Sequence, residues 1–480
     1  MSRPPQLPQS ASTSLNPLAE TFSFHSSPEQ FIASRALSLH AANVSSASSQ
    51  KPVKAHILGR NVVVLSSHAQ VMHVLRQGKD PGSSEPKDTE PYVAAPAYAQ
   101  LMGPFFPSPN LLLSEGEDHS CMRRDWEGKM AMAAAEALSP EAISRLTDEH
   151  FASLLEAGER VSLYATLKAL AWKILLGVFL GLESEDELFN EVTSLQGDLL
   201  RGQFSVFPVS VNIGLWQSPR SKGIAARRKL QRILGPHVQK MRADGTGCPF
   251  NGADDAKDDV EEAANHLLLF TSSLSAKALA SLLTAFLLNL FLSPGLCAGV
   301  AASTTAETER GRLLCSTLLE TERLSPPIVG IMRRAQAQDV VVSHEDGHPA
   351  TLIPSGWDAW LYFVGAGRDP SVFGANCDKF DPRRFMDSRS GNPVQDTVPT
   401  VAFSAGKKEC LGKEFARSAC LAVGRTLVQK GLGLEGAVDA PGVRAWLGWE
   451  KQGPEEWARD MRQLPTQRPA VPIMAKVVHL

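Results

Sequence analysis

The sequence has few cysteines for its length, and their spacing excludes two kinds of site. The chain has 480 residues and seven cysteines. No two of them form a C-x-x-C pair or a zinc-type spacing, so neither a zinc site nor a disulfide framework is expected. All but one are predicted to be free thiols in a reducing compartment. These are Cys121, Cys248, Cys297, Cys315, Cys377 and Cys420.

The chain also lacks a strong charge of either sign and an apolar N-terminal run. Its formal net charge is -3, which gives no electrostatic reason to expect nucleic acid as a partner. Residues 1–18 are rich in Pro, Ser and Gln, and no signal or anchor sequence is expected there. We predict a flexible lead-in over residues 1–50 with a short helix near residues 28–42. A soluble, cytoplasmic protein without a transmembrane anchor follows, while peripheral membrane attachment and organelle import stay open.

One long apolar run remains, at residues 266–291, and it would span about 39 Å as a helix. Thr271, Ser275 and Lys277 interrupt it. Polar and charged side chains are costly inside a bilayer, so the pattern favours a buried central helix over a membrane span.

The most informative segment is residues 403–412, Phe-Ser-Ala-Gly-Lys-Lys-Glu-Cys-Leu-Gly. Cys410 precedes a predicted helix N-terminus, where backbone N–H groups favour a thiolate. Gly406 and Gly412 allow a close backbone approach. The pattern resembles the haem-binding signature of the cytochrome P450 family, which implies haem b with Cys410 as the iron ligand and Phe403, Gly406, Lys408 and Gly412 around it. The alternative for a cysteine viewed alone is a small buried core residue.

Two further segments resemble the same family. Glu320 and Arg323 are three residues apart and share a helix face. An E-x-x-R pair alone usually means a surface salt bridge of little energy. In the family it is a buried ion pair behind the haem, and Arg384, in Pro-Arg-Arg-Phe, would complete that network.

The family resemblance also implies residues for the two haem propionates. His119 and Arg123 are spaced i, i+4 and can point at one anionic group. The alternative is that both side chains lie on a solvent-exposed helix face and bind no ligand. The second propionate is assigned to Arg333 or Arg334, with Arg334 preferred, and Lys408 assists.

At the oxygen-activation motif the sequence departs from the family pattern. Residues 271–275 stand where monooxygenases of the family carry an acid–threonine pair, and here the pair is Leu274 and Ser275. Leucine cannot relay a proton. Ser275 is expected to organise a water in place of the usual pair, and Leu274 and Phe270 are expected to wall the distal pocket.

Together these features predict a mainly α protein with a small β part, of the cytochrome P450 type with a long central helix over the haem. Residues 51–480 are predicted to form a single catalytic domain. The function that these features favour is monooxygenation of an apolar small molecule, such as a lipid or secondary metabolite, with electrons from a separate reductase. The alternatives are a fatty-acid hydroperoxide isomerase, dehydratase or peroxygenase of the same fold, and a non-catalytic haem-binding sensor. The substrate itself is not readable from the sequence.

Overall fold

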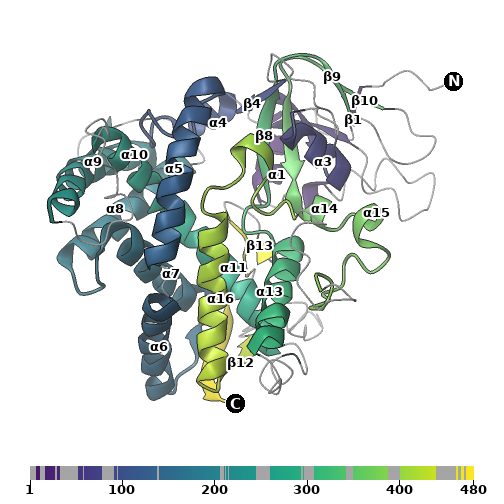
Figure 1. Ribbon diagram of the computed structural model, residues 1–480. Coiled ribbons are helices and arrows are strands. Elements are labelled where there is room, and N and C mark those ends of the chain that lie inside the picture. Colours follow the sequence, from purple (N-terminus) through teal and green to yellow (C-terminus); the bar gives the residue numbers. More distant parts are fainter. Residues whose placement is uncertain are drawn as a thin grey trace.

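The structure is a computed structural model, shown in Figure 1. It describes residues 7–10, 17–26, 30–32, 52–57, 59–77, 91–94, 96–137, 140–205, 210, 212–213, 216–244, 260–292, 296, 307–341, 350–386, 400–438, 461–462, 466–469 and 472–480.

Helices make up most of the described chain, and most of the long ones lie opposite the sheet, while several short ones lie beside it (Figure 1). They are α1 (Pro17–Ser26), α3 (His68–Leu75), α4 (Pro96–Met102), α5 (Gly116–Ala137), α6 (Pro140–Ala157), α7 (Leu163–Leu180), α8 (Glu187–Gln203), α9 (Pro219–Asp244), α10 (Val260–Phe270), α11 (Ser273–Leu292), α13 (Glu307–Leu324), α14 (Phe363–Gly367), α15 (Pro370–Phe373) and α16 (Lys413–Gln429).

The helical core forms around α7 and α11, which pack on each other. Both sequences are apolar on nearly every face, as expected of helices enclosed by other helices. Helix α7 ends at Gly181, whose φ of 61° places it in the left-handed region. Its N–H binds the carbonyl of Gly177, and the next N–H, from Leu182, binds Leu176, which satisfies the last carbonyls of the helix.

The largest sheet of the described chain lies at the other side of the molecule and contains six of the fifteen described strands, in the order β1-β2-β3-β11-β8-β4. Alternate side chains of β2 are buried, the pattern of a strand with one face on a core. The strands of this sheet are β1 (Gln9–Ser10), β2 (Val53–Ile57), β3 (Arg60–Leu65), β4 (Tyr92–Ala94), β8 (Gly330–Ala335) and β11 (Asp358–Tyr362).

Smaller sheets complete the β part. The C-terminal strand joins two distant segments in the order β12-β15-β5. The smaller sheets comprise β5 (Val161–Ser162), β6 (Asn212–Ile213), β7 (Trp216–Gln217), β9 (Asp339–Val341), β10 (Thr351–Ile353), β12 (Leu432–Val438), β13 (Met461–Arg462), β14 (Arg468–Pro469) and β15 (Ile473–His479). The prediction of a mainly α fold with a small β part is confirmed.

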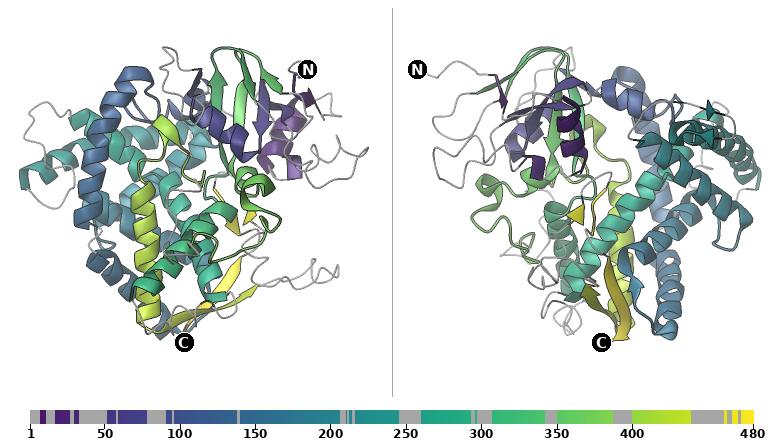
Figure 2. Two further views of the ribbon diagram at one scale, coloured as in Figure 1. Left: turned by 45° about the vertical axis from the view of Figure 1, so that its right-hand side comes forward. Right: turned by 180° about the vertical axis from the view of Figure 1, so that it is seen from behind.

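The long central helix is divided at the oxygen-activation motif. It breaks between α10 and α11, at Thr271 and Ser272. The hydroxyl of Ser272 accepts the N–H of Ser275 at 3.2 Å, the bond of a helix N-cap to its third residue. The serine-rich sequence therefore starts a new helix where the run was expected to continue. Figure 2 shows α11 from behind, crossing the molecule obliquely.

Two helical stretches are long and apolar enough to cross a membrane by length and composition. These are Leu163–Leu180 and Val260–Phe291, of which 61% and 72% lie buried inside the fold. Both are enclosed by neighbouring helices, as core helices of globular proteins are. Helix α1 precedes the predicted helix near residues 28–42. Residues 30–32 are helical, and the rest of the predicted 28–42 helix lies outside the described residues.

Candidate functional site

The loop that carries Cys410 is closed by its own backbone. The N–H of Cys410 donates to the carbonyl of Phe403 at 2.8 Å, across the 3₁₀ turn η2 (Gly406–Lys408). Gly406 has a φ of 71°, and a Cβ there would lie 2.5 Å from the carbonyl oxygen of Leu75. Glycine is therefore needed at this position both for its backbone conformation and for the contact with α3.

Cys410 lies at the entrance to α16, and its side chain is exposed. Burial of the sulfur among the surrounding elements nevertheless raises the pKa of the Cys410 thiol, while the N–H of Gly412 and the charge of Arg123 oppose the rise. The thiolate expected at this loop stays a prediction. A coordinated metal ion deprotonates such a thiol, so the thiolate form depends on the metal.

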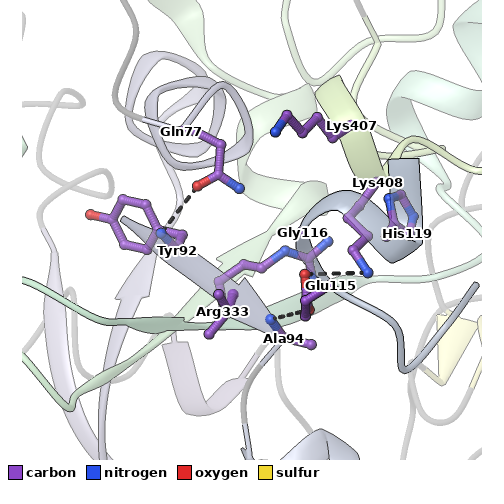
Figure 3. A pocket seen from close by; sticks show the side chains of 10 residues that line it. Gln77, Tyr92, Ala94, Glu115, Gly116, His119, Arg333, Lys407 and Lys408 are labelled. Carbon is purple, nitrogen blue, oxygen red and sulfur yellow. Dashed lines mark hydrogen bonds and ion pairs between the residues drawn. The ribbon is translucent and has the colours of Figure 1, made fainter. Parts of the chain in front are cut away.

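A cationic pocket lies beside this loop (Figure 3). Its enclosed volume is only about 10 Å³, and four of its lining residues carry basic side chains. These are His119, Arg333, Lys407 and Lys408. Glu115 is the acid of the lining, and its carboxylate lies 3.4 Å from the ammonium of Lys408. The pocket therefore keeps a surplus of positive charge, which suits an anionic group.

Strand β8 places one of its two adjacent arginines in this pocket. Consecutive strand residues point to opposite faces. Arg333 lines the pocket, whereas Arg334 turns to the buried carboxylate of Asp358 with an N–O distance of 2.5 Å. The structure therefore places Arg333 at the pocket and Arg334 at Asp358, and which of them holds a propionate stays a prediction. The pairing of β8 with β11, which puts Arg334 opposite Asp358, was not readable from the sequence.

The structure brings Glu320, Arg323 and Arg384 together in one network, in which Glu320 and Arg323 are buried and Arg384 is partly exposed. Arg323 binds the Glu320 carboxylate through two nitrogens at 2.7 Å each. Arg384 adds a third contact at 3.0 Å. The remaining Arg323 nitrogen donates to the carbonyls of Gly367 and Cys377, so the charge of the network holds the chain that follows β11 against α13.

The comparisons with known proteins agree with this geometry. A family model described as Cytochrome P450 matches residues 304–430, which include Glu320, Arg323 and Cys410. Cytochrome P450 26C1 of Homo sapiens is 26% identical over 411 residues, covering 76% of this chain and 73% of that protein. Abscisic acid 8'-hydroxylase 3 of Oryza sativa subsp. indica is 26% identical over 405 residues, covering 78% of this chain and 74% of that protein. Among solved structures, retinoic acid bound cyanobacterial CYP120A1 covers 100% of both chains with a TM-score of 0.70 and 21% identity. The chain is a member of the cytochrome P450 family.

The cytochrome P450 fold implies a haem cofactor, and the residues of this chain fit one. The only soft ligand that the loop offers is Cys410, which stands with its side chain exposed. The cations of the neighbouring pocket match the carboxylates of a haem. Among the described residues, no group of three or more His, Cys, Asp or Glu could hold a metal ion by itself.

Arg123 takes a position different from the one expected in this cytochrome P450. It does not line the pocket with His119. Its guanidinium donates to the carbonyl of Glu409 at 2.5 Å and to the carboxylate of Glu127 at 2.6 Å. The i, i+4 spacing therefore does not bring the two cations onto one group, and Arg123 instead ties α5 to the residue before Cys410.

A second buried ion pair lies behind the cysteine loop and was missed from the sequence. Arg417, on α16, binds the buried carboxylate of Glu322 on α13 at 2.7 and 2.9 Å. Burial raises the pKa of Glu322, and the paired guanidinium opposes that rise. Arg417 also lies 5.6 Å from the ring centre of Phe403. The pair joins partners 95 residues apart, a separation at which no local spacing rule applies.

The residues of the oxygen-activation motif are occupied by local contacts. The hydroxyl of Ser275 donates to the carbonyl of Leu269 at 3.2 Å and lies 3.0 Å from the hydroxyl of Ser272. Leu274 packs against the helical core. Phe270 contacts the rings of Trp126 and Phe179. The roles of Ser275, Leu274 and Phe270 in the distal pocket stay predictions.

A buried histidine next to this motif was also missed. Nε2 of His266 accepts the N–H of Leu111 at 3.2 Å, and Nδ1 donates to the carbonyl of Glu262 at 2.9 Å. The ring stacks on Trp126 with 4.2 Å between centres. Burial lowers the pKa of His266 to about 4, so the ring is neutral at pH 7. It fastens the segment before α5 to α10.

Proposed function

We propose that this cytochrome P450 is a monooxygenase that binds haem b through Cys410 and acts on an apolar small molecule. The observation that carries the proposal is the closed Cys410 loop, in which the N–H of Cys410 is bound to Phe403 and the side chain is exposed. Haem iron with a thiolate ligand supplies the electron donation that favours O–O cleavage.

We propose the following roles for the chain's own residues. Cys410 gives up its thiol proton on binding the metal, and Arg123 and Lys413 lower the energy of the resulting negative charge. His119, Arg333 and Lys408 are proposed to hold the two propionates through charge-assisted hydrogen bonds. Glu320, Arg323 and Arg384 keep the chain behind the loop in place.

The relatives support oxygenation of small molecules. One is named as an abscisic acid 8'-hydroxylase, and a structural neighbour binds retinoic acid. For this chain, an apolar substrate with an oxidisable carbon is proposed. Electrons would come from a separate donor protein.

The oxygen motif favours a second candidate, transformation of a fatty-acid hydroperoxide. Leu274 offers no proton, and the Ser275 hydroxyl is bound to the carbonyl of Leu269. A hydroperoxide already contains the O–O bond, so this reaction does not need protons delivered to dioxygen. In the monooxygenase, Ser272 and Ser275 together would position the water that delivers them.

One experiment separates the two candidates. The purified protein is first tested for haem and for the ferrous CO spectrum of a thiolate-ligated iron, with Cys410→Ser as the variant that should lose that spectrum. The protein is then given apolar substrates with NADPH and a reductase, and separately a linoleate hydroperoxide without either.

NADPH-dependent product supports the monooxygenase, and Ser275→Ala should then release more peroxide per NADPH consumed. Fast reductase-free conversion of the hydroperoxide, with no NADPH-dependent product, would replace the first candidate by the second. A thiolate CO spectrum that persists in Cys410→Ser would overturn both, since both require this ligand.

A further inference from the structure

A buried carboxylate that the proposed mechanism does not use lies behind the cysteine loop, where α13 and α16 pack on each other (Figure 1). Glu322, on α13, has no exposed surface. It accepts Nε and one Nη of Arg417, on α16, at 2.9 and 2.7 Å. Only 17% of the Arg417 side chain is exposed. Because the desolvation of two charges offsets much of their attraction, such a pair contributes little net stability, and its role is sought in the geometry that it fixes.

The pair contacts the chain on both sides of the cysteine loop. The hydroxyl of Thr400, which precedes the loop, lies 3.5 Å from the Glu322 carboxylate and 3.4 Å from the same Nη of Arg417. Arg417 itself follows Cys410 on α16. One buried carboxylate therefore connects the start of this segment with its end. We refer to Glu322, Thr400 and Arg417 as the Glu322 network.

The guanidinium of Arg417 also lies against the ring of Phe403. Its central carbon is 5.6 Å from the ring centre, within the range of a cation–π contact. Phe403 is the residue whose carbonyl accepts the N–H of Cys410 at 2.8 Å. A displacement of the guanidinium would therefore move the ring, and through the Phe403 backbone it would alter the bond that closes the loop.

Direct action of the Glu322 network on the sulfur is a weaker explanation. Glu322 and Arg417 carry opposite charges in direct contact, so their fields largely cancel at a distance. Other charged groups, closer to the loop, shift the pKa of the Cys410 thiol. These are Arg123, Glu409 and Lys413. An effect of the network on the sulfur is therefore expected to pass through Phe403.

We propose that Glu322 and Arg417 are positioning residues for the cysteine loop. They fix the Phe403 ring, and through the Phe403 carbonyl they fix Cys410 toward the haem iron. The inference rests on the proposed function, because it takes Cys410 as the ligand of a bound haem. The reduction potential of a haem depends on its axial ligand and on the groups that surround that ligand. The Glu322 network therefore controls the potential without contact with the sulfur.

The test measures the midpoint potential of the haem-loaded protein without substrate, together with its ferrous CO spectrum. Glu322→Gln nearly keeps the side-chain volume and leaves Arg417 without its counter-charge. The equilibrium between ferric and ferrous haem should change by at least about threefold, which is about 28 mV for a one-electron couple. A smaller share of the ferrous CO complex should show the thiolate spectrum.

A conservative variant separates position from charge. Arg417→Lys keeps a cation for Glu322 but lacks the planar guanidinium that reaches both Thr400 and the Phe403 ring. Its urea midpoint should lie closer to that of the parent than the midpoint of Arg417→Met does. Its potential should nevertheless be shifted, as in Glu322→Gln.

A double variant identifies the route of the effect. In a Phe403→Leu background, Glu322→Gln should cause no further shift in potential, because the ring on which the network acts is absent. Ile57→Ala controls for a general loss of stability. Ile57 belongs to the core cluster between α1 and the large sheet, apart from the cluster against which Phe403 packs, so this variant should keep the parent's potential.

A Glu322→Gln protein with the parent's potential and CO spectrum would overturn the proposal. So would an equal shift with and without the Phe403 ring, or a shift of the same size in Ile57→Ala. If Glu322→Gln does not fold, Arg417→Lys decides by the same criteria. Failure of the proposed function has a different signature: the parent would show the thiolate CO spectrum and form no product from apolar substrates with NADPH and reductase, while the potentials of the variants would still differ.

Discussion

At the scale of single residues, charge placement in this protein is decided by which face of an element a side chain occupies. Arg333 and Arg334 are neighbours on β8, yet one lines the cationic pocket and the other is bound to Asp358. Asp358 is fully buried, and only one of its carboxylate oxygens has a partner among the described residues. Removal of Arg333 is therefore expected to weaken haem binding, whereas removal of Arg334 is expected to lower the stability of the fold.

Arg333→Ala is predicted to speed the loss of haem to apomyoglobin by about tenfold or more, because one charge-assisted contact to a propionate disappears. Arg334→Ala is predicted to keep haem nearly as well as the parent. Arg334→Ala is predicted to lower the free energy of unfolding by about 3 kcal/mol, because the buried carboxylate of Asp358 loses its cation. Urea unfolding measures the second effect, and equal haem loss in the two variants would contradict the assignment.

A similar contrast separates buried from surface ion pairs. Glu320 receives two arginines and the N–H of Asp381, whereas Glu149 lies 3.9 Å from Arg145 with both side chains exposed. Glu320→Gln is predicted to lower the unfolding free energy by about 3–5 kcal/mol, because Arg323 becomes an unpaired buried charge. Glu149→Gln should cost less than about 1 kcal/mol. Similar urea midpoints for the two variants would show that the buried network does not stabilise the fold.

At the scale of elements, local sequence signals predicted some boundaries closely and missed others. The two strands before residue 66 are apolar runs on either side of the Gly59 turn, a pattern that the sequence shows directly. The break between α10 and α11 does not follow from the apolar pattern, because the same apolar run continues across it. The break depends on whether the Ser272 hydroxyl accepts the N–H of Ser275 and so begins a new helix.

Long-range pairing was the second limit of the sequence. Glu320 and Arg323 share a helix face, so their contact followed from spacing. The Glu322–Arg417 pair depends on how α13 and α16 pack, and the choice between Arg333 and Arg334 depends on strand register. Neither is encoded in any local spacing. The cysteine loop was predictable because its chemistry lies within ten consecutive residues.

Lys277, on α11, is expected to make the stability of the fold depend on pH. Lys277 has a pKa of about 8 in the fold and 10.5 as its ordinary value. Between these values the unfolded chain holds the proton and the native chain does not, so stability contributed by this residue rises with pH over that window. Lys277→Met is therefore predicted to unfold at a higher urea concentration than the parent at pH 7.

The gain should shrink as pH rises from 8 to 10.5, where the parent lysine becomes neutral in both states. Lys229→Met, on the surface of α9, serves as the control and should show no such trend. A Lys277→Met variant that is less stable than the parent at pH 7 would mean that an anion or a hydrogen bond already compensates the charge.

At the scale of the whole molecule, the Cys410 loop is fastened from several distant elements. Arg123 holds it to α5, Lys408 binds the carbonyl of Ser114, and Gly406 packs on the end of α3. Behind it, Arg417 connects α16 to α13. Because these partners come from both the helical side and the sheet side of the molecule, the position of the cysteine depends on the complete fold and is supported on all of these sides.

The helical core also contains two neutral histidines, which predicts how the whole molecule responds to acid. Burial lowers the pKa of both His150 and His266 to about 4, from an ordinary value of 6.5. Between pH 6.5 and pH 4 the unfolded chain binds protons that the native chain excludes, so the stability of the fold falls as pH decreases through this window. The effect of these two residues is complete below about pH 4.

The double variant His150→Gln, His266→Gln is predicted to flatten this part of the stability profile, because glutamine takes no proton. Its stability at pH 7 should be lower than the parent's, since the bonds from His266 to Leu111 and Glu262 are changed. The slope between pH 6.5 and pH 4 is the relevant quantity, measured by urea unfolding at half-unit steps. His479→Gln replaces an exposed histidine on β15 and should keep the parent's slope. If the double variant keeps that slope as well, carboxylates rather than these histidines control the acid response.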